Sequence, residues 1–216
     1  MMAAVAVCAT ASVAGAQSVD ATIDRAVAAW AKVRTVRGTF EQTVTNPITG
    51  SSATAKGSYV QERPSRLAIR FSDPATDAIV SDGKSVWIYL PSSAPNQVIK
   101  RSATDKSALP IDLTGQFLDA PKSKYDISAA GTASAQGHPA HVLRLVAKKD
   151  GGAPVTRATV WVDDDDYIIR EFETVEPSGV TRHIKLTSLE LNGAVDASTF
   201  SFTPPKGARI IDQSKP

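Results

Sequence analysis

The feature that most constrains this chain is a long series of short β-type runs separated by turn-forming residues, beginning at Gly38. Turns are indicated at Asn46-Pro47, Asp82-Gly83, Pro177-Ser178-Gly179 and Asn192-Gly193, where these residue types readily adopt conformations that end a strand. About eleven strands fit this spacing, at residues 39–45, 53–61, 66–71, 78–80, 86–90, 97–100, 125–130, 141–148, 157–162, 167–175 and 180–191. Such regular spacing favours an antiparallel barrel or strongly curved sheet over a parallel α/β fold.

Two segments have helical rather than strand character. In residues 19–36, apolar side chains recur every three or four positions, at Ile23, Val27, Trp30 and Val33. This period predicts an amphipathic helix with one apolar face. Residues 107–120 are apolar without alternation, contain a proline near their start and are followed by another, so they predict one or two short helices. Apolar helices in a β protein need an apolar surface to cover.

Two of the expected strands describe that surface. Residues 66–71 alternate, with Leu67, Ile69 and Phe71 on one face and arginines on the other, whereas residues 86–90 are apolar on both faces. We therefore expect a mainly β (α+β) fold: an incomplete antiparallel barrel whose apolar concave side is covered by the two helical segments. The alternative, left open by periodicity alone, is that these helices simply complete an ordinary core.

Composition and motifs exclude several classes of function. The net charge of +2 is too small to indicate a nucleic-acid surface. The chain contains no nucleotide-binding glycine loop, no zinc-protease motif and no nucleophile elbow. We accordingly expect a protein that binds without catalysis, and neither a metal nor another cofactor.

The histidines and the run of aspartates, which are the residue types that could bind a metal, do not match a known metal-site motif. His138 and His141 flank a proline without an acidic residue at ligand spacing, which favours surface histidines over a metal site. The four consecutive aspartates at 163–166 lack the glycine and the distal glutamate of a calcium loop. They are expected to form a solvated hairpin tip.

The first 16 residues have the character of a secretory signal peptide. They are small and apolar, without a charged side chain, and end in Ala14-Gly15-Ala16. Cys8 lies within them, so the mature domain, residues 17–216, is expected to contain no cysteine and to act in the periplasm. A buried N-terminal helix is the alternative interpretation of this segment.

Specific strings, in order along the chain, resemble the LolA family of outer-membrane lipoprotein carriers. They are FEQ at 40–42, ERP at 62–64, SDGKSVWIY at 81–89, NGAVD at 192–196 and FSFTPPKG at 200–207. The resemblance implies a half-open barrel with a helical lid, and a cavity that shields lipoprotein acyl chains. It also implies a monomer that receives lipoproteins from the inner-membrane transporter LolCDE and passes them to the outer-membrane acceptor LolB.

The resemblance also assigns roles to residues. Arg63 of the R-P motif is expected to bond carbonyl groups of the lid and hold the empty cavity shut, with Pro64 setting the backbone beside it. The alternative for Arg63 is a surface arginine lying over the barrel rim. The expected acyl-chain lining comprises Trp30, Phe40, Leu67, Ile69, Phe71, Trp87, Tyr89, Ile111, Leu113, Phe117 and Leu118. Leu67 and Ile69 stand where well-known family members carry aromatic residues, which puts aromatic contacts with the donor in doubt.

Two other functions fit parts of the pattern. A periplasmic sensor or regulatory domain of the same half-barrel architecture would bind a lipid or peptide as a signal. A hydrolase would need a nucleophile and a base close together in a cleft, and the sequence suggests no such pair.

Overall fold

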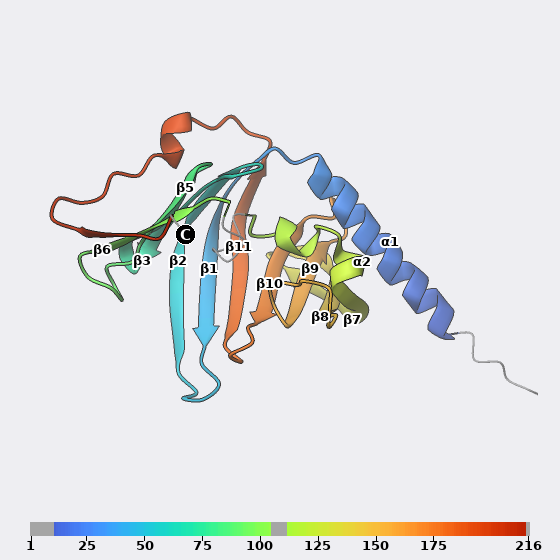
Figure 1. The fold of residues 1–216 in the computed structure, drawn as a ribbon. Helices are drawn as coiled ribbons and strands as arrows, with labels where there is room; N and C mark the ends of the chain where they lie inside the picture. The colour runs from blue at the N-terminus through green and yellow to red at the C-terminus, as the bar shows by residue number, and fades with distance from the viewer. Residues whose placement is uncertain (1–10, 105–111, 215–216) are drawn as a thin grey trace, which may run out of the picture.

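The computed structural model describes residues 11–104 and 112–214, which form one large sheet with a long helix on one side (Figure 1). The helices are α1 (Ala11–Ala31) and α2 (Pro121–Lys124), with 3-10 turns η1 (Gly115–Phe117) and η2 (Ala197–Phe200). The strands are β1 (Thr35–Thr45), β2 (Ser52–Glu62), β3 (Arg66–Asp73), β4 (Ala75–Asp82), β5 (Ser85–Tyr89), β6 (Gln97–Ser102), β7 (Tyr125–Ala135), β8 (His138–Ala147), β9 (Arg157–Asp163), β10 (Ile169–Val175), β11 (Thr181–Leu191) and β12 (Arg209–Asp212).

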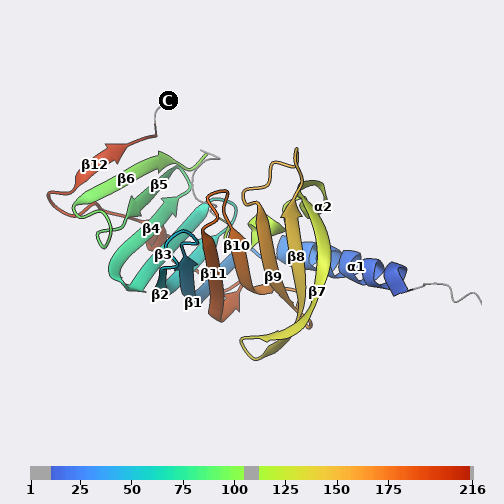
Figure 2. The same cartoon turned by 90° about the horizontal axis from the view of Figure 1, so that it is seen from below.

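The sheet has the order β12-β6-β5-β4-β3-β2-β1-β11-β10-β9-β8-β7 and curves without closing (Figure 2). Its neighbours are antiparallel except for β12, which pairs in parallel with β6. The predicted incomplete antiparallel barrel is confirmed, and each of the eleven expected runs overlaps an observed strand. The twelfth strand was not predicted, because four residues after a Pro- and Gly-containing stretch carry too little pattern to distinguish a strand from a tail.

The sheet has two faces with different coverings. The inner face carries Leu67 and Ile69 and packs against α1 in one hydrophobic core. The outer face carries Ala68 and Val80, which pack against Phe200 in a separate cluster. Strand alternation sends neighbouring side chains to opposite faces, so the clean alternation of β3 supplies both clusters.

The predicted amphipathic helix is present but is displaced towards the N-terminus. It runs from Ala11 to Ala31 rather than over residues 19–36, and its apolar positions Ile23, Ala26 and Trp30 are buried. The helix ends early because the chain turns, with the Val33 amide bonded to the Trp30 carbonyl at 3.0 Å, and then enters β1. The expected signal segment, 1–16, lies largely outside the described residues.

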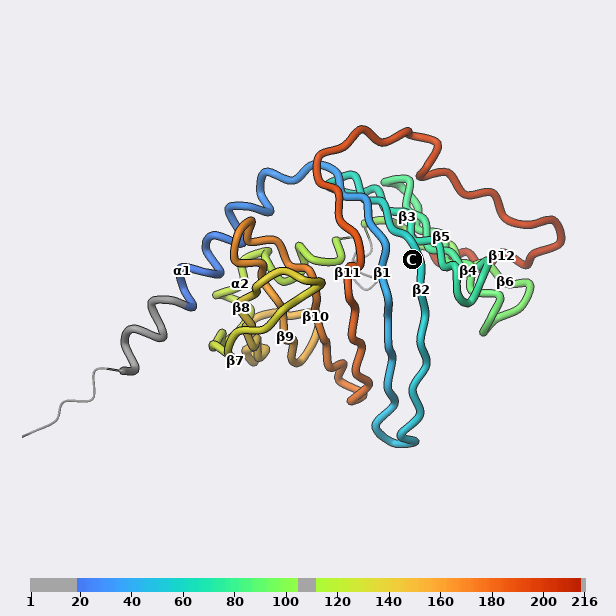
Figure 3. The backbone as a smooth tube through the Cα atoms, turned by 180° about the vertical axis from the view of Figure 1, so that it is seen from behind, coloured from blue at the N-terminus to red at the C-terminus, as the bar shows by residue number. Residues whose placement is uncertain are grey.

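The segment between β6 and β7 supplies the second part of the inner covering. Of the predicted helical region, residues 107–111 lie outside the described residues, and the rest forms η1, followed by α2. We use the term lid for α1 together with residues 112–124. The outer face is covered by a different segment. After β11 the chain crosses this face and returns to the sheet as β12 (Figure 3).

Candidate functional site

Arg63 lies at the end of β2 and reaches across to the end of α1. Its Nη1 donates hydrogen bonds to the carbonyl oxygens of Trp30, at 2.7 Å, and Val33, at 3.0 Å. Its guanidinium carbon is 5.5 Å from the centroid of the Trp30 ring. Pro64 follows through a cis peptide bond in the turn before β3. The side chain therefore bridges the sheet and the lid rather than lying over the rim.

The position suits an arginine for a physical reason. Carbonyl groups in the last turn of a helix lack intrahelical partners and carry the negative end of the helix dipole. A guanidinium offers several donors in a rigid fork and is always charged, so it can satisfy two such carbonyls at once. The Arg63 contact ties the C-terminal end of α1 to the sheet.

Asp112 completes this junction and was missed by sequence reasoning. Its Oδ2 accepts a hydrogen bond from Trp30 Nε1 at 3.1 Å and lies 3.5 Å from Arg63 Nε. Its Oδ1 accepts from the Gly115 amide at 2.8 Å, which shapes the start of η1. The sequence feature that could have indicated this role is a single carboxylate within the largely apolar segment 107–118. Asp112 joins both parts of the lid to Arg63.

Tyr59 lies near the same junction, on the inner face of β2. It is 2% exposed, and burial, followed by the nearby Asp112 carboxylate, raises the pKa of its phenol well above the usual value. Tyr59 therefore remains a neutral group within the covered face.

Most of the predicted lining residues lie in one core that the inner face of the sheet and the lid form together. The structure places in one core Trp30, Phe40, Leu67, Ile69, Phe71, Leu113, Phe117 and Leu118. Phe40 and Phe71 meet edge to face with ring centroids 5.5 Å apart, and Phe117 packs on Phe172 at 5.1 Å. Ile111 lies outside the described residues. An apolar ligand on this face would have to take the place of lid side chains that now fill it.

The placement of Trp87 and Tyr89 in the lining was wrong. Both lie on the outer face, where their rings are 5.9 and 6.1 Å from that of Phe202. Register explains this: Ile88 pairs with Ile79 of the inner core, so its neighbours Trp87 and Tyr89 point outward. On β4 and β5, the inner-core residues that sequence reasoning did not select are Ile79, Val86 and Ile88.

An open cavity of about 580 Å³ lies where α1 meets the rest of the lid. Its lining combines apolar groups with the charged junction: Val27, Trp30, Ala31, Arg63, Asp112, Gly115, Gln116, Leu118, Asp119 and Ala120. The cavity lies between the two lid segments that Asp112 joins.

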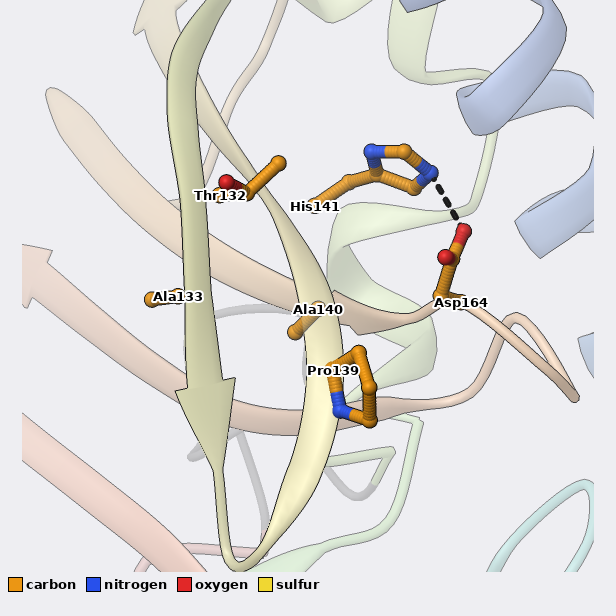
Figure 4. Close-up of a pocket in the computed structure, with 6 residues that line it drawn as sticks. All are labelled: Thr132, Ala133, Pro139, Ala140, His141 and Asp164. Carbon is orange, nitrogen blue, oxygen red and sulfur yellow. Dashed lines mark ion pairs between the residues drawn. The ribbon is translucent and has the colours of Figure 1, made fainter.

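A smaller hollow of about 190 Å³ lies at the β7–β8 end of the sheet (Figure 4). His141 Nε2 is 2.7 Å from Asp164 Oδ1 there, and neighbouring Asp163 pairs with Arg170 and with His138. Asp163 is fully buried, so the predicted solvated tip is wrong for this residue, although Asp164, Asp165 and Asp166 are exposed. The ion pairs join the two hairpins, and among the described residues no group of three or more His, Cys, Asp or Glu is arranged to hold a metal.

Comparison with known proteins gives a consistent family. Residues 31–203 match the family described as outer membrane lipoprotein carrier protein LolA. An outer-membrane lipoprotein carrier protein from Methylibium petroleiphilum is 30% identical over 210 residues, covering 93% of each chain. One from Klebsiella pneumoniae is 29% identical over 185 residues, covering 85% of this chain and 84% of its relative.

Solved structures resemble the fold at low identity. An uncharacterized conserved protein from Thermus thermophilus aligns with a TM-score of 0.55 and 13% identity, over 91% of this chain and 100% of that one. The Pseudomonas aeruginosa MucA/MucB complex contains a chain that aligns with a TM-score of 0.50 and 15% identity, over 86% of this chain and 61% of that one. Among the described residues, no helix is both long and apolar enough to span a bilayer.

Proposed function

Because the chain belongs to the outer membrane lipoprotein carrier protein LolA family, we propose that it carries lipoproteins through the periplasm with their acyl chains against the inner face of the sheet. The observation that supports this most directly is the junction at Arg63. It ties an apolar covering to an apolar face through a few directional bonds. In this proposal the carrier binds and releases cargo without any covalent step.

Binding depends on an exchange of apolar contacts. Each acyl methylene removed from water contributes about 0.8 kcal/mol, so long chains alone would bind too tightly to be handed on. The closed lid opposes this, since Trp30, Phe117 and Leu118 must leave the core before acyl chains enter. The net affinity is the difference between two large terms, which permits release.

The route of the cargo follows from the family. The chain is exported through its signal segment, 1–16, and works as a monomer. It accepts lipoproteins from an inner-membrane LolCDE transporter and delivers them to a LolB-type acceptor at the outer membrane. Arg63, Pro64 and Asp112 together form the latch of the closed state.

A periplasmic regulatory domain of the same fold is the second candidate, suggested by the likeness to the chain from the MucA/MucB complex. That likeness concerns the fold alone at 15% identity, whereas the carrier relatives match at about 30% over most of their length. A regulator would bind a lipid or a peptide as a signal, including a partner that carries no acyl chain. A carrier would bind only acylated proteins, and only as the lid opens.

The test is a transfer assay with Arg63→Leu, using donor membranes that contain the transporter and acceptor membranes with LolB. Loss of two charged hydrogen bonds weakens the closed state by roughly 1.5 to 3 kcal/mol. We expect the variant to take up lipoprotein and to pass on at least tenfold less.

Arg66→Leu is the matched control. Arg66 is the first residue of β3, directly after the turn that contains Arg63, but it pairs with Glu62 at 3.0 Å instead of with the lid. It should transfer cargo as the wild type does. Normal transfer by Arg63→Leu would show that Arg63 is no latch, and failure of the wild-type protein to take up any lipoprotein would refute the carrier proposal.

A further inference from the structure

Gln61 is a buried polar residue that the closed structure leaves without hydrogen bonds. It lies on β2 and is 1% exposed. Neither its side-chain oxygen nor its side-chain nitrogen has a partner in the part of the chain that is described. A buried amide that loses its bonds to water and gains none in return destabilises the state in which this occurs. A state in which the amide is paired would remove this cost.

The position of Gln61 places its amide on the inner face, under the lid. It pairs across the sheet with Val36 and Leu67, both of which belong to the inner core. Tyr59 precedes it by two residues on the same face, and Arg63 of the lid junction follows by two. Because a strand rises about 3.3 Å per residue, Gln61 lies roughly 7 Å in from the residue that holds the lid.

The chemistry of an acyl group matches this position. A fatty chain is joined to its head by an ester or amide, so one carbonyl lies where hydrocarbon meets the polar group. The Gln side chain offers two N–H donors and a carbonyl acceptor. It can donate to an ester carbonyl, and it can both donate to and accept from an amide.

We propose that Gln61 binds the carbonyl of an acyl linkage when the lid opens, so that the site recognises acyl esters and amides and not merely hydrocarbon. This inference rests on the proposed lipid-carrying function and names the group that would be recognised. The unpaired amide also weakens the closed state and thereby favours loading. Removing the amide should raise the stability of the empty protein and lower its affinity for ester-linked lipid.

The probes are a diacylglyceryl lipopeptide with ester-linked chains and the analogue in which the same chains are joined through ethers, which lack the carbonyl. Binding of each is measured to the full chain by displacement of a fluorescent fatty probe. The wild type should bind the ester about tenfold more tightly than the ether. Gln61→Met, which keeps a long unbranched side chain, should bind both with equal affinity, near that of the wild type for the ether.

Val60→Met is the matched control, because it places the same side chain one residue away on the outer face. It should keep the preference for the ester. Thermal unfolding of the empty proteins should give Gln61→Met a midpoint at or above that of the wild type, which separates loss of recognition from misfolding.

The possible results are distinct. No ester preference in the wild type, or an unchanged preference in Gln61→Met, would overturn the inference while leaving the carrier function in place. Failure of the wild type to bind either lipid would overturn the carrier function as well.

Discussion

The two faces of the sheet are covered in different ways. On the outer face, the covering lies between β11 and β12, so it is attached to the sheet at both ends, and its own residues Phe200 and Phe202 pack onto the sheet (Figure 1). On the inner face, α1 joins the sheet only where it leads into β1, and the rest of its attachment consists of side-chain contacts. A segment attached at one end, such as α1, can swing while that attachment holds, whereas residues 112–124 of the lid lie between β6 and β7 and are attached at both ends, like the outer covering.

Side-chain hydrogen bonds hold both coverings. On the outer side, Arg37 donates to the Ala194 carbonyl at 3.0 Å. On the inner side, Arg63 ties the end of α1 to the sheet, and Asp112 accepts a hydrogen bond from Trp30 of α1. We therefore expect the outer covering to stabilise the fold and, in the proposed carrier, α1 to regulate access to the inner face.

The largest effect on stability should come from the outer covering. Phe200→Ala removes a ring that is 2% exposed and should lower the free energy of unfolding by about 3–5 kcal/mol, measured by urea titration. Lipid affinity of the folded protein should not change. Val146→Ala, at a position 43% exposed, is the control and should remain near the wild type. A large change in lipid affinity in Phe200→Ala would show that the outer covering also affects lipid binding.

A variant away from both coverings separates lid effects from general destabilisation. Burial of Asp163 would raise its pKa, but hydrogen bonds from Arg170 and from the Asp165 amide outweigh this and hold the pKa below the usual range. Asp163→Asn should lower the unfolding free energy at pH 7 by roughly 1.5 to 3 kcal/mol. Lipid binding should be unaffected.

The pH dependence of that variant has a definite sign. Since the pKa of Asp163 is lower in the folded state than in the unfolded state, its contribution is complete above the usual carboxyl pKa and is lost as pH falls through the lowered value. The gap between wild type and Asp163→Asn should narrow in acid. Asp165→Asn, on the exposed part of the same turn, should show little gap at any pH, and a gap that widened in acid would contradict the assignment.

The smallest but most specific effect is expected inside the lid. A Cβ at residue 115 would overlap Asp112 Oδ2 and Trp30 Nε1, so Gly115→Ala should break their hydrogen bond while leaving Arg63 in place. With the closed state weakened, lipid should bind about tenfold more tightly, as measured by probe displacement. Ser123→Ala, in α2 and away from Asp112, should bind as the wild type does. Unchanged affinity in Gly115→Ala would exclude Asp112 from the latch.

Local patterns were sufficient for much of the fold. Alternation in β3 correctly separated Leu67 and Ile69 from the opposite face, because each strand residue points away from its neighbours whatever the rest of the chain does. Turn residues located the ends of the strands, because their backbone preferences are also local. The arginine of the R-P motif was recognised from the family resemblance, and the structure places it against the carbonyls of Trp30, in α1, and Val33, just after it.

Other features depended on pairing between distant segments. β5 is apolar on both faces, so only its register with β4 could assign Ile88 to the inner face and Trp87 to the outer one. Asp112 meets Trp30 across 82 residues of chain, and β12 pairs with a strand more than a hundred residues earlier. Gln61 looks in the sequence like an ordinary strand residue. That its amide is buried without a partner is decided by what packs over it, and a local pattern contains no information about that.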